Sequence, residues 1–159
     1  MFQNQVHMCV YICTGAYIMR RYYKVFCFPI SRPAKPTDVN KVIIRNDESD
    51  LRCWSSVGQQ GGIQYIQLTQ GCFVEEAVSH ELMHSIGFLH EHQRPDRDEY
   101  VHVNESCIQK GKEHNFEIQK DLLTYGLKYR AKSIMHYPSD AFTIGNCQTI
   151  TSKVSKFPF

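Results

Sequence analysis

The histidine spacing between positions 80 and 90 constrains this chain more than any other feature of its sequence. His80 and His84 lie four residues apart within residues 75–86, where apolar positions recur near helical spacing and the first turn is acidic. Side chains four apart on a helix are separated by about 40° around its axis, so both imidazoles are able to reach one metal ion. Gly87 is suited to the left-handed conformation that ends a helix, which lets the chain turn and bring in His90 as a third nitrogen ligand.

Three histidine ligands indicate a catalytic zinc ion rather than a structural one. They leave one position of tetrahedral zinc open, and zinc lowers the pKa of the water bound there to about 7. Glu81 directly follows the first ligand and is predicted to be the general base that takes the proton of this water. We interpret the isolated His7, His102 and His114 as ordinary core or surface residues. The sequence therefore predicts one Zn²⁺ per chain.

Length and charge limit the class of protein further. The 159 residues suit one domain with a single core. Eighteen basic and sixteen acidic residues leave a net charge of +2, which is no electrostatic footprint for nucleic acid. No apolar run reaches the roughly 18–20 residues that cross a bilayer. Seven cysteines favour an oxidising compartment, and their odd number leaves at least one without an intrachain partner.

Hydrophobic patterning predicts an ordered first half and a loop-rich second half. Residues 42–44 form a β-branched run that predicts a buried strand, and residues 63–68 predict a second strand. The interleaved Gln64 and Gln67 predict that one face or one edge of this second strand is solvated. Further along, residues 116–123 predict one more short helix.

Two distant blocks of this sequence resemble one known family. The stretch from His80 to His90 matches the metzincin signature HExxHxxGxxH, and the run continuing to Asp98 closely resembles the astacin family of zinc endopeptidases. Ser-Ile-Met-His-Tyr at residues 133–137 is similar to the Met-turn of that family. The stretches Cys-Trp-Ser at 53–55 and Gly-Cys-Phe at 71–73 also resemble astacin motifs. The resemblance covers roughly residues 25–153.

The resemblance implies an α+β, metzincin-type domain of two subdomains. A small twisted mixed sheet and the central zinc-binding helix are followed by a loop-rich second half. The peptidase domain is expected over residues 25–159, with its cleft between about 25–90 and 91–159. Residues 1–24 match no part of the family pattern, and the C-terminal end of the peptidase domain is expected to be missing from this chain. Residues 63–68 are implied to be the cleft-edge strand on which an extended protein or peptide substrate lies.

The family's functional residues carry over position by position. His80, His84 and His90 are implied to ligate zinc, with Glu81 as general base. The tyrosine of the Met-turn, Tyr137, is implied to be a further zinc ligand that swings away to stabilise the oxyanion.

The resemblance also assigns residues around the metal. Met135 is implied to form an apolar floor under the zinc ion. Glu91 is implied to meet the new N-terminus that forms when a propeptide is removed. Cys53 and Cys72 are implied to form a disulfide.

Other features of the ends leave alternatives open. Cys27 resembles a cysteine whose family partner lies beyond residue 159. Neither Cys107 nor Cys147 matches a family position, and Cys147 is one candidate substitute partner for Cys27. Residues 6–19 are about as apolar and as long as a signal-peptide core, but Arg20-Arg21 follows them and no small-residue cleavage site is present. The pattern favours a helix or an unfolded leader over a signal peptide.

The sequence thus predicts a secreted, monomeric zinc metalloendopeptidase that hydrolyses internal peptide bonds, with no nucleic-acid partner and no membrane span. The alternative is a non-catalytic or unstable truncated relative that acts as a zinc-containing binding module. Replacing Glu81 by Gln separates the two, since a binding module would keep its function.

Overall fold

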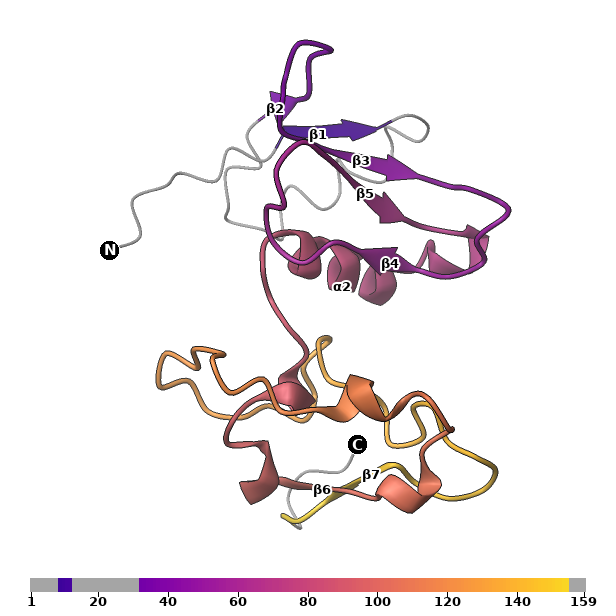
Figure 1. Ribbon diagram of the computed structural model, residues 1–159, viewed down its shortest axis with the longest axis vertical. Coiled ribbons are helices and arrows are strands. Elements are labelled where there is room, and N and C mark those ends of the chain that lie inside the picture. The colour runs from indigo at the N-terminus through magenta and orange to yellow at the C-terminus, as the bar shows by residue number, and fades with distance from the viewer. Residues whose placement is uncertain (1–8, 13–31, 155–159) are drawn as a thin grey trace. The chain divides into compact units, whose positions relative to one another are not determined.

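The computed structural model describes residues 9–12 and 32–154 of the chain, with side chains from residue 34 onward. The chain divides into two compact units, Met1–Phe88 and Leu89–Phe159 (Figure 1). The helix or unfolded leader predicted at residues 6–19 is wrong for residues 9–12, which form a strand, because their backbone pairs with neighbouring strands of a sheet. The rest of that stretch and Cys27 fall outside the described residues. Within the described part of the chain, the helices are too short and too polar to cross a membrane.

The first unit is built on a five-stranded mixed sheet with the strand order β2-β1-β3-β5-β4. β1, β2, β3 and β5 pair in parallel, and β4 pairs antiparallel with β5. The strands predicted at residues 42–44 and 63–68 are confirmed. The five strands are β1 (Cys9–Ile12), β2 (Arg32–Pro33), β3 (Lys41–Arg45), β4 (Trp54–Ser55) and β5 (Ile63–Gln67).

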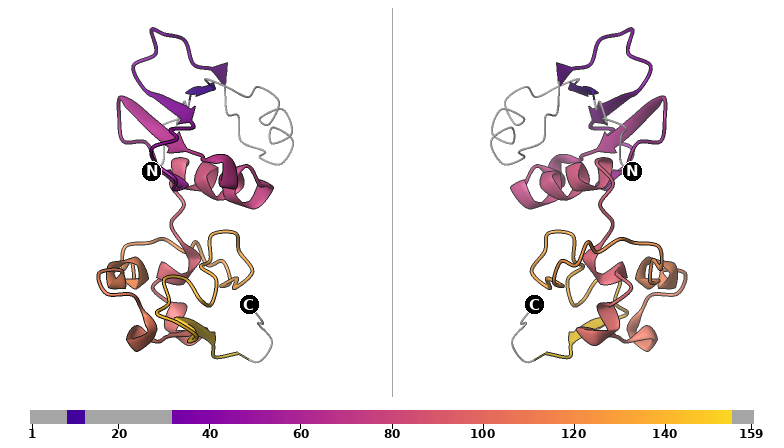
Figure 2. Two further views of the ribbon diagram at one scale, coloured as in Figure 1. Left: turned by 90° about the vertical axis from the view of Figure 1, so that its right-hand side faces the viewer. Right: turned by 90° about the vertical axis from the view of Figure 1, so that its left-hand side faces the viewer.

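A single α-helix of the described residues, α2 (Glu75–Ser85), packs across one face of this sheet against β4 and β5 (Figure 2). Glu75 and Glu76 in its first turn interact favourably with the positive end of the helix dipole. Its buried apolar side chains complete the core of the unit, so the predicted helix and the predicted α+β class are confirmed. The buried core residues are Val42, Ile66, Leu68, Cys72, Val78 and Leu82.

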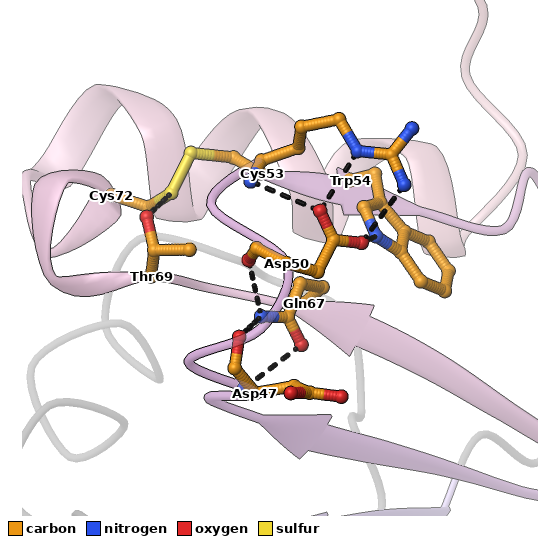
Figure 3. The surroundings of a disulfide bond; sticks show 8 residues. Asp47, Asp50, Cys53, Trp54, Gln67, Thr69 and Cys72 are labelled. Carbon is orange, nitrogen blue, oxygen red and sulfur yellow. Dashed lines mark hydrogen bonds and ion pairs between the residues drawn. A yellow bond between two sulfur atoms is a disulfide. The ribbon is translucent and has the colours of Figure 1, made fainter.

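The prediction of a solvated face or edge on residues 63–68 is wrong. Gln67 is fully buried, and Gln64 is nearly so. The carboxamide of Gln67 accepts a hydrogen bond from the amide of Asp47 at 3.2 Å and donates to the carbonyls of Asp47 and Asp50 at 2.9 and 3.1 Å (Figure 3). A buried carboxamide with such partners costs little, so polar residues do not mark a wet face here.

The same region shows that β5 is not the edge strand predicted at residues 63–68. Trp54 and Ser55 of β4 pair with Gln67 and Ile66 of β5, so β4 closes this side of the sheet. The indole of Trp54 donates to the carboxylate of Asp50 at 2.8 Å (Figure 3). Gln67 and Asp50 therefore fix the loop that leads into β4.

The second unit contains little regular structure among its described residues. β6 (Val101–Val103) and β7 (Ile150–Ser152) form a two-stranded antiparallel sheet. Short 3₁₀ turns connect the rest: η2 (Glu91–Gln93), η3 (Arg97–Glu99), η4 (Glu105–Cys107) and η5 (Glu113–Phe116), whereas η1 (Gln70–Cys72) belongs to the first unit. The buried core residues are Val101, Ile108, Phe116, Tyr129, Ala131 and Ile150.

The short helix predicted at residues 116–123 is wrong. The chain forms a 3₁₀ turn that ends at Phe116 and then continues through turns. The amide of Gln119 donates to the carbonyl of Gln93 at 2.8 Å, a contact with another segment that takes the place of a helical hydrogen bond. Tertiary hydrogen bonding has overridden the local pattern.

Two disulfides join the four cysteines whose side chains the structure describes. Cys53 pairs with Cys72 and links the loop before β4 to the turn before α2 (Figure 3). Cys107 pairs with Cys147 within the second unit. The suggestion that Cys147 substitutes as partner of Cys27 is therefore wrong.

Candidate metal centre

Helix α2 carries His80, Glu81 and His84. The rings of His80 and His84 lie 4.6 Å apart between centroids, as close as the four-residue spacing predicts, and their planes are nearly perpendicular. Nδ1 of His84 lies 2.8 Å from the carbonyl oxygen of Phe88. Because a carbonyl only accepts, Nδ1 carries the hydrogen and the lone pair is on Nε2, the form in which Nε2 ligates a metal.

The end of α2 supplies this carbonyl. Gly87 has a φ of 105°, as predicted for the residue that terminates the helix. The amide of Phe88 donates to the carbonyl of Met83 at 3.0 Å, and the amide of Gly87 donates to that of His84 at 2.9 Å, which together form a Schellman motif. The turn thus ends the helix and also brings a main-chain acceptor to the ring of His84.

Glu81 lies on the buried side of the helix. It is 6% exposed, and its Oε2 has no hydrogen-bond partner among the described residues. Burial of this carboxyl group raises the pKa of Glu81 from 4.5 to about 7. In the protein without metal, Glu81 is therefore balanced between its acid and base forms near neutral pH.

In the second unit, an aromatic cluster surrounds Tyr137. The ring of His90 lies 4.5 Å from that of Tyr137, and the fully buried ring of His92 stacks on Tyr137 at 4.0 Å with 28° between the planes. Phe116 and Phe142 approach the same ring at 5.8 and 5.6 Å. The tyrosine ring is thus held between other rings of its own unit.

Glu91 and Met135 contact each other through the main chain. The amide of Glu91 donates to the carbonyl of Met135 at 2.8 Å, and the Met135 side chain is buried. Oε1 of Glu91 accepts hydrogen bonds from Arg94 at 3.1 Å and from the amide of Arg130 at 2.7 Å. Glu91 therefore ties three segments of the second unit together.

The three predicted ligands form a group able to hold a metal ion. His80, His84 and His90 each offer one ligand atom, and these atoms all lie within 4.8 Å of one another. Neutral imidazoles are suitable ligands for zinc, and three of them leave room for a fourth ligand. The donor set and the His84 tautomer fit the predicted ion.

Comparison with known proteins agrees with these motifs. The family model named Astacin, which describes a family of peptidases, matches residues 14–158. The chain belongs to the astacin family.

Its relatives within the family include a protein named as a zinc metalloproteinase. The chain is 37% identical over 140 residues to zinc metalloproteinase nas-6 of Caenorhabditis elegans, covering 86% of this chain and 39% of that protein. It is 43% identical over 108 residues to meprin A subunit beta of Mus musculus, covering 66% of this chain and 15% of that protein. The chain therefore spans well under half of the length of these relatives.

A solved astacin-type structure has the same fold. High choriolytic enzyme 1, a hatching enzyme zinc-protease from Oryzias latipes, matches with a TM-score of 0.77 at 26% sequence identity. The match covers 92% of this chain and 76% of that chain. The metzincin-type α+β fold expected from the sequence is thereby confirmed.

Sequence reasoning missed several residues that this astacin-family chain uses around its histidines. Phe88 contributes only its carbonyl, so no side-chain pattern announces it. The other missed residues directly follow the metzincin signature and are His92, Gln93 and Arg94. Their position within three residues of His90 or Glu91 is the sequence feature that could have identified them. All three are buried, which is unusual for such polar side chains and marks them as structural partners of the site.

Proposed function

We propose that this chain is a zinc-dependent endopeptidase that hydrolyses internal peptide bonds of proteins, with residues 25–159 as its peptidase domain. One observation carries the proposal: Glu81 has a buried carboxylate oxygen without a hydrogen-bond partner in the part of the chain that the structure describes, and it lies on the same helix as two members of a three-histidine group. A structural zinc site needs four ligands and no general base, whereas this arrangement has three ligands and one candidate base.

The proposed chemistry divides between the ion and the protein. His80, His84 and His90 would hold a zinc ion, which would supply polarisation of the scissile carbonyl and a lower pKa of bound water. Glu81 accepts the proton of the attacking water and passes it to the leaving amine nitrogen. Tyr137 donates a hydrogen bond to the carbonyl oxygen as negative charge develops there.

We infer that the substrate lies extended along β4 rather than along residues 63–68. β4 is the outer strand of the sheet on this side, and it packs against the helix that carries His80 and His84. An extended peptide is able to hydrogen-bond to such an edge as an added strand, which explains how one site accepts the main chain of many proteins.

The remaining assignments concern the surroundings of the ion and the location of the protein. We propose Met135 as the apolar floor beneath zinc and Glu91 as the acceptor of a processed N-terminus. Two disulfides among the described cysteines are typical of a secreted protein, so we propose an extracellular, monomeric enzyme.

The first experiment measures zinc content and cleavage of a denatured protein for the wild type and for Glu81→Gln. We expect one zinc per chain in both proteins and a loss of cleavage of about 10²–10⁴-fold in the variant, because only the general base is removed. Glu76→Gln changes an exposed carboxylate on the same helix and is the matched control, with wild-type cleavage expected. A chelator should abolish cleavage, and readded zinc should restore it.

Two results would contradict the proposal. Cleavage by Glu81→Gln at the wild-type rate would remove Glu81 from the mechanism. Zinc binding without cleavage in either protein would favour the non-catalytic binding module.

A further inference from the structure

The side chain of Gln93 contacts the metal-binding histidine that follows the helix. Gln93 is 8% exposed, and its Oε1 lies 3.1 Å from Nδ1 of His90. Its Nε2 lies 3.4 Å from the carbonyl oxygen of Asn115. Because that carbonyl only accepts, the amide nitrogen of Gln93 must face Asn115 and the amide oxygen must face His90. The imidazole of His90 then carries its hydrogen on Nδ1.

The carbonyl of Asn115 is a fixed anchor for this contact. Asn115 lies in the 3₁₀ turn η5, and carbonyls in the last turn of a helix lack partners within the helix. The same carbonyl accepts a second hydrogen bond from Nε2 of His92 at 3.0 Å. The main chain of Gln93 is also held, because its carbonyl accepts the amide of Gln119 at 2.8 Å. Both ends of the Gln93 residue are therefore restrained while its amide oxygen faces His90.

We propose that Gln93 is a positioning residue that holds His90 in the tautomer with its lone pair on Nε2 and fixes the rotation of the ring for metal binding. This inference rests on the proposed function only in taking His90 as a zinc ligand, not in the peptidase reaction. Hydrogen-bond partners of metal-ligating histidines orient the ring and raise its basicity, and their loss costs about 10–100-fold in metal affinity. The carbonyl of Phe88 makes the corresponding contact to Nδ1 of His84, so two ligands have an acceptor on the same ring atom.

The first test measures zinc affinity by competition with a chromogenic chelator. Gln93→Met keeps an unbranched side chain of similar volume but removes the amide, and we expect it to bind zinc about 10–100-fold more weakly. Gln93→Glu keeps an oxygen facing His90 and should restore affinity to within a few-fold of the wild type. Gln109→Met is the control, since it removes a glutamine hydrogen bond to the carbonyl of Thr143 away from the histidines. Unchanged affinity in a Gln93→Met protein that still melts cooperatively would overturn the proposal.

The second test needs no variant. Nitrogen-15 chemical shifts of the metal-free wild type, above the histidine pKa range, report which ring nitrogen of His90 carries the hydrogen. We expect the Nδ1–H form, and a His90 that is predominantly Nε2–H would overturn the proposal even if Gln93→Met did not fold. Both readouts are independent of cleavage. A wild type that binds zinc but cleaves nothing would contradict the proposed function and leave the role of Gln93 to these two measurements.

Discussion

The two compact units hold their functional side chains by different means. In Met1–Phe88, a regular helix places His80 and His84 by spacing alone, and a sheet supports that helix. In Leu89–Phe159, the described strands are three residues long and the chain is held by side-chain hydrogen bonds to the main chain. Periodicity therefore encodes the first half of the site, whereas individual buried polar contacts encode the second half.

Substitution of Arg94 is expected to lower the free energy of unfolding most, because the contacts of its buried side chain stabilise the second unit. Its side chain is 7% exposed and contacts Glu91 at 3.1 Å, Asp96 at 2.8 Å and the carbonyl of Leu127 at 2.8 Å. Arg94→Met leaves those acceptors without their cation, and we expect the free energy of unfolding to fall by about 3–5 kcal/mol in urea denaturation. Arg52→Met removes an ion pair in the first unit whose arginine side chain is 80% exposed, and it should change stability far less. Equal effects of the two substitutions would refute the contrast between the units.

The pH dependence of stability tests the burial of Glu81 on helix α2 in the first unit. Burial raises the pKa of folded Glu81 from 4.5 to about 7, so the metal-free fold favours the protonated form of this carboxyl group. The stability of the metal-free protein relative to Glu81→Gln should therefore be highest below about pH 4.5. It should fall by about 3 kcal/mol as the pH rises through 7, since one pKa unit corresponds to about 1.4 kcal/mol. Chemical denaturation of both proteins from pH 4.5 to 8.5 measures the difference, and a flat difference would contradict the burial of this carboxyl group.

Gly87 tests whether the helix end depends on backbone conformation rather than on side chains. Its φ of 105° is unfavourable for any residue with a Cβ, so Gly87→Ala should lower the free energy of unfolding by about 1–2 kcal/mol. Gly71→Ala is the control, because Gly71 has no positive φ and a Cβ there meets nothing within 4 Å. Thermal unfolding of the two variants should separate them clearly, and equal midpoints would mean that the turn adapts.

Tyr129 gives the smallest expected effect, within the second unit. Its hydroxyl lies 2.6 Å from Nε2 of the buried His136, whose Nδ1 bonds the carbonyl of Tyr137. Tyr129→Phe removes one buried hydrogen bond and should cost about 1 kcal/mol. Tyr125→Phe alters a ring that is 73% exposed and should be close to neutral in the same urea denaturation series. A neutral Tyr129→Phe would show that this unit tolerates the loss of single polar contacts.

The success of the sequence-based predictions differs between the two units in the same way. The strands at residues 42–44 and 63–68 and the helix at residues 75–86 were predictable because their apolar residues repeat with the period of each element. The same reasoning gave a wrong prediction for Gln67. Its hydrogen-bond partners are main-chain atoms of a loop twenty residues away in the sequence, and no local pattern reveals them. The helix expected at residues 116–123 failed because Gln119 bonds Gln93 instead of its own helical neighbour.

The candidate site divides in the same way. The grouping of His80, His84 and His90 was predictable, since a helix repeat and one glycine define it. The contacts that orient these rings were not, because Phe88 acts through its carbonyl and Gln93 through a carboxamide whose partner Asn115 is remote in sequence. The partner of Cys147 was equally invisible, since spacing alone does not decide among several cysteines.

The turn at the end of α2 has a consequence for which substitutions at position 88 preserve the orientation of His84. The carbonyl of Phe88 contacts His84, while the Phe88 side chain is 46% exposed and takes no part in that contact. The hydrogen bond to His84 therefore depends on the main chain at position 88 and not on the identity of its side chain. A substitution that keeps the turn intact should leave the orientation of this candidate metal ligand unchanged, because the carbonyl that accepts the hydrogen bond stays in place.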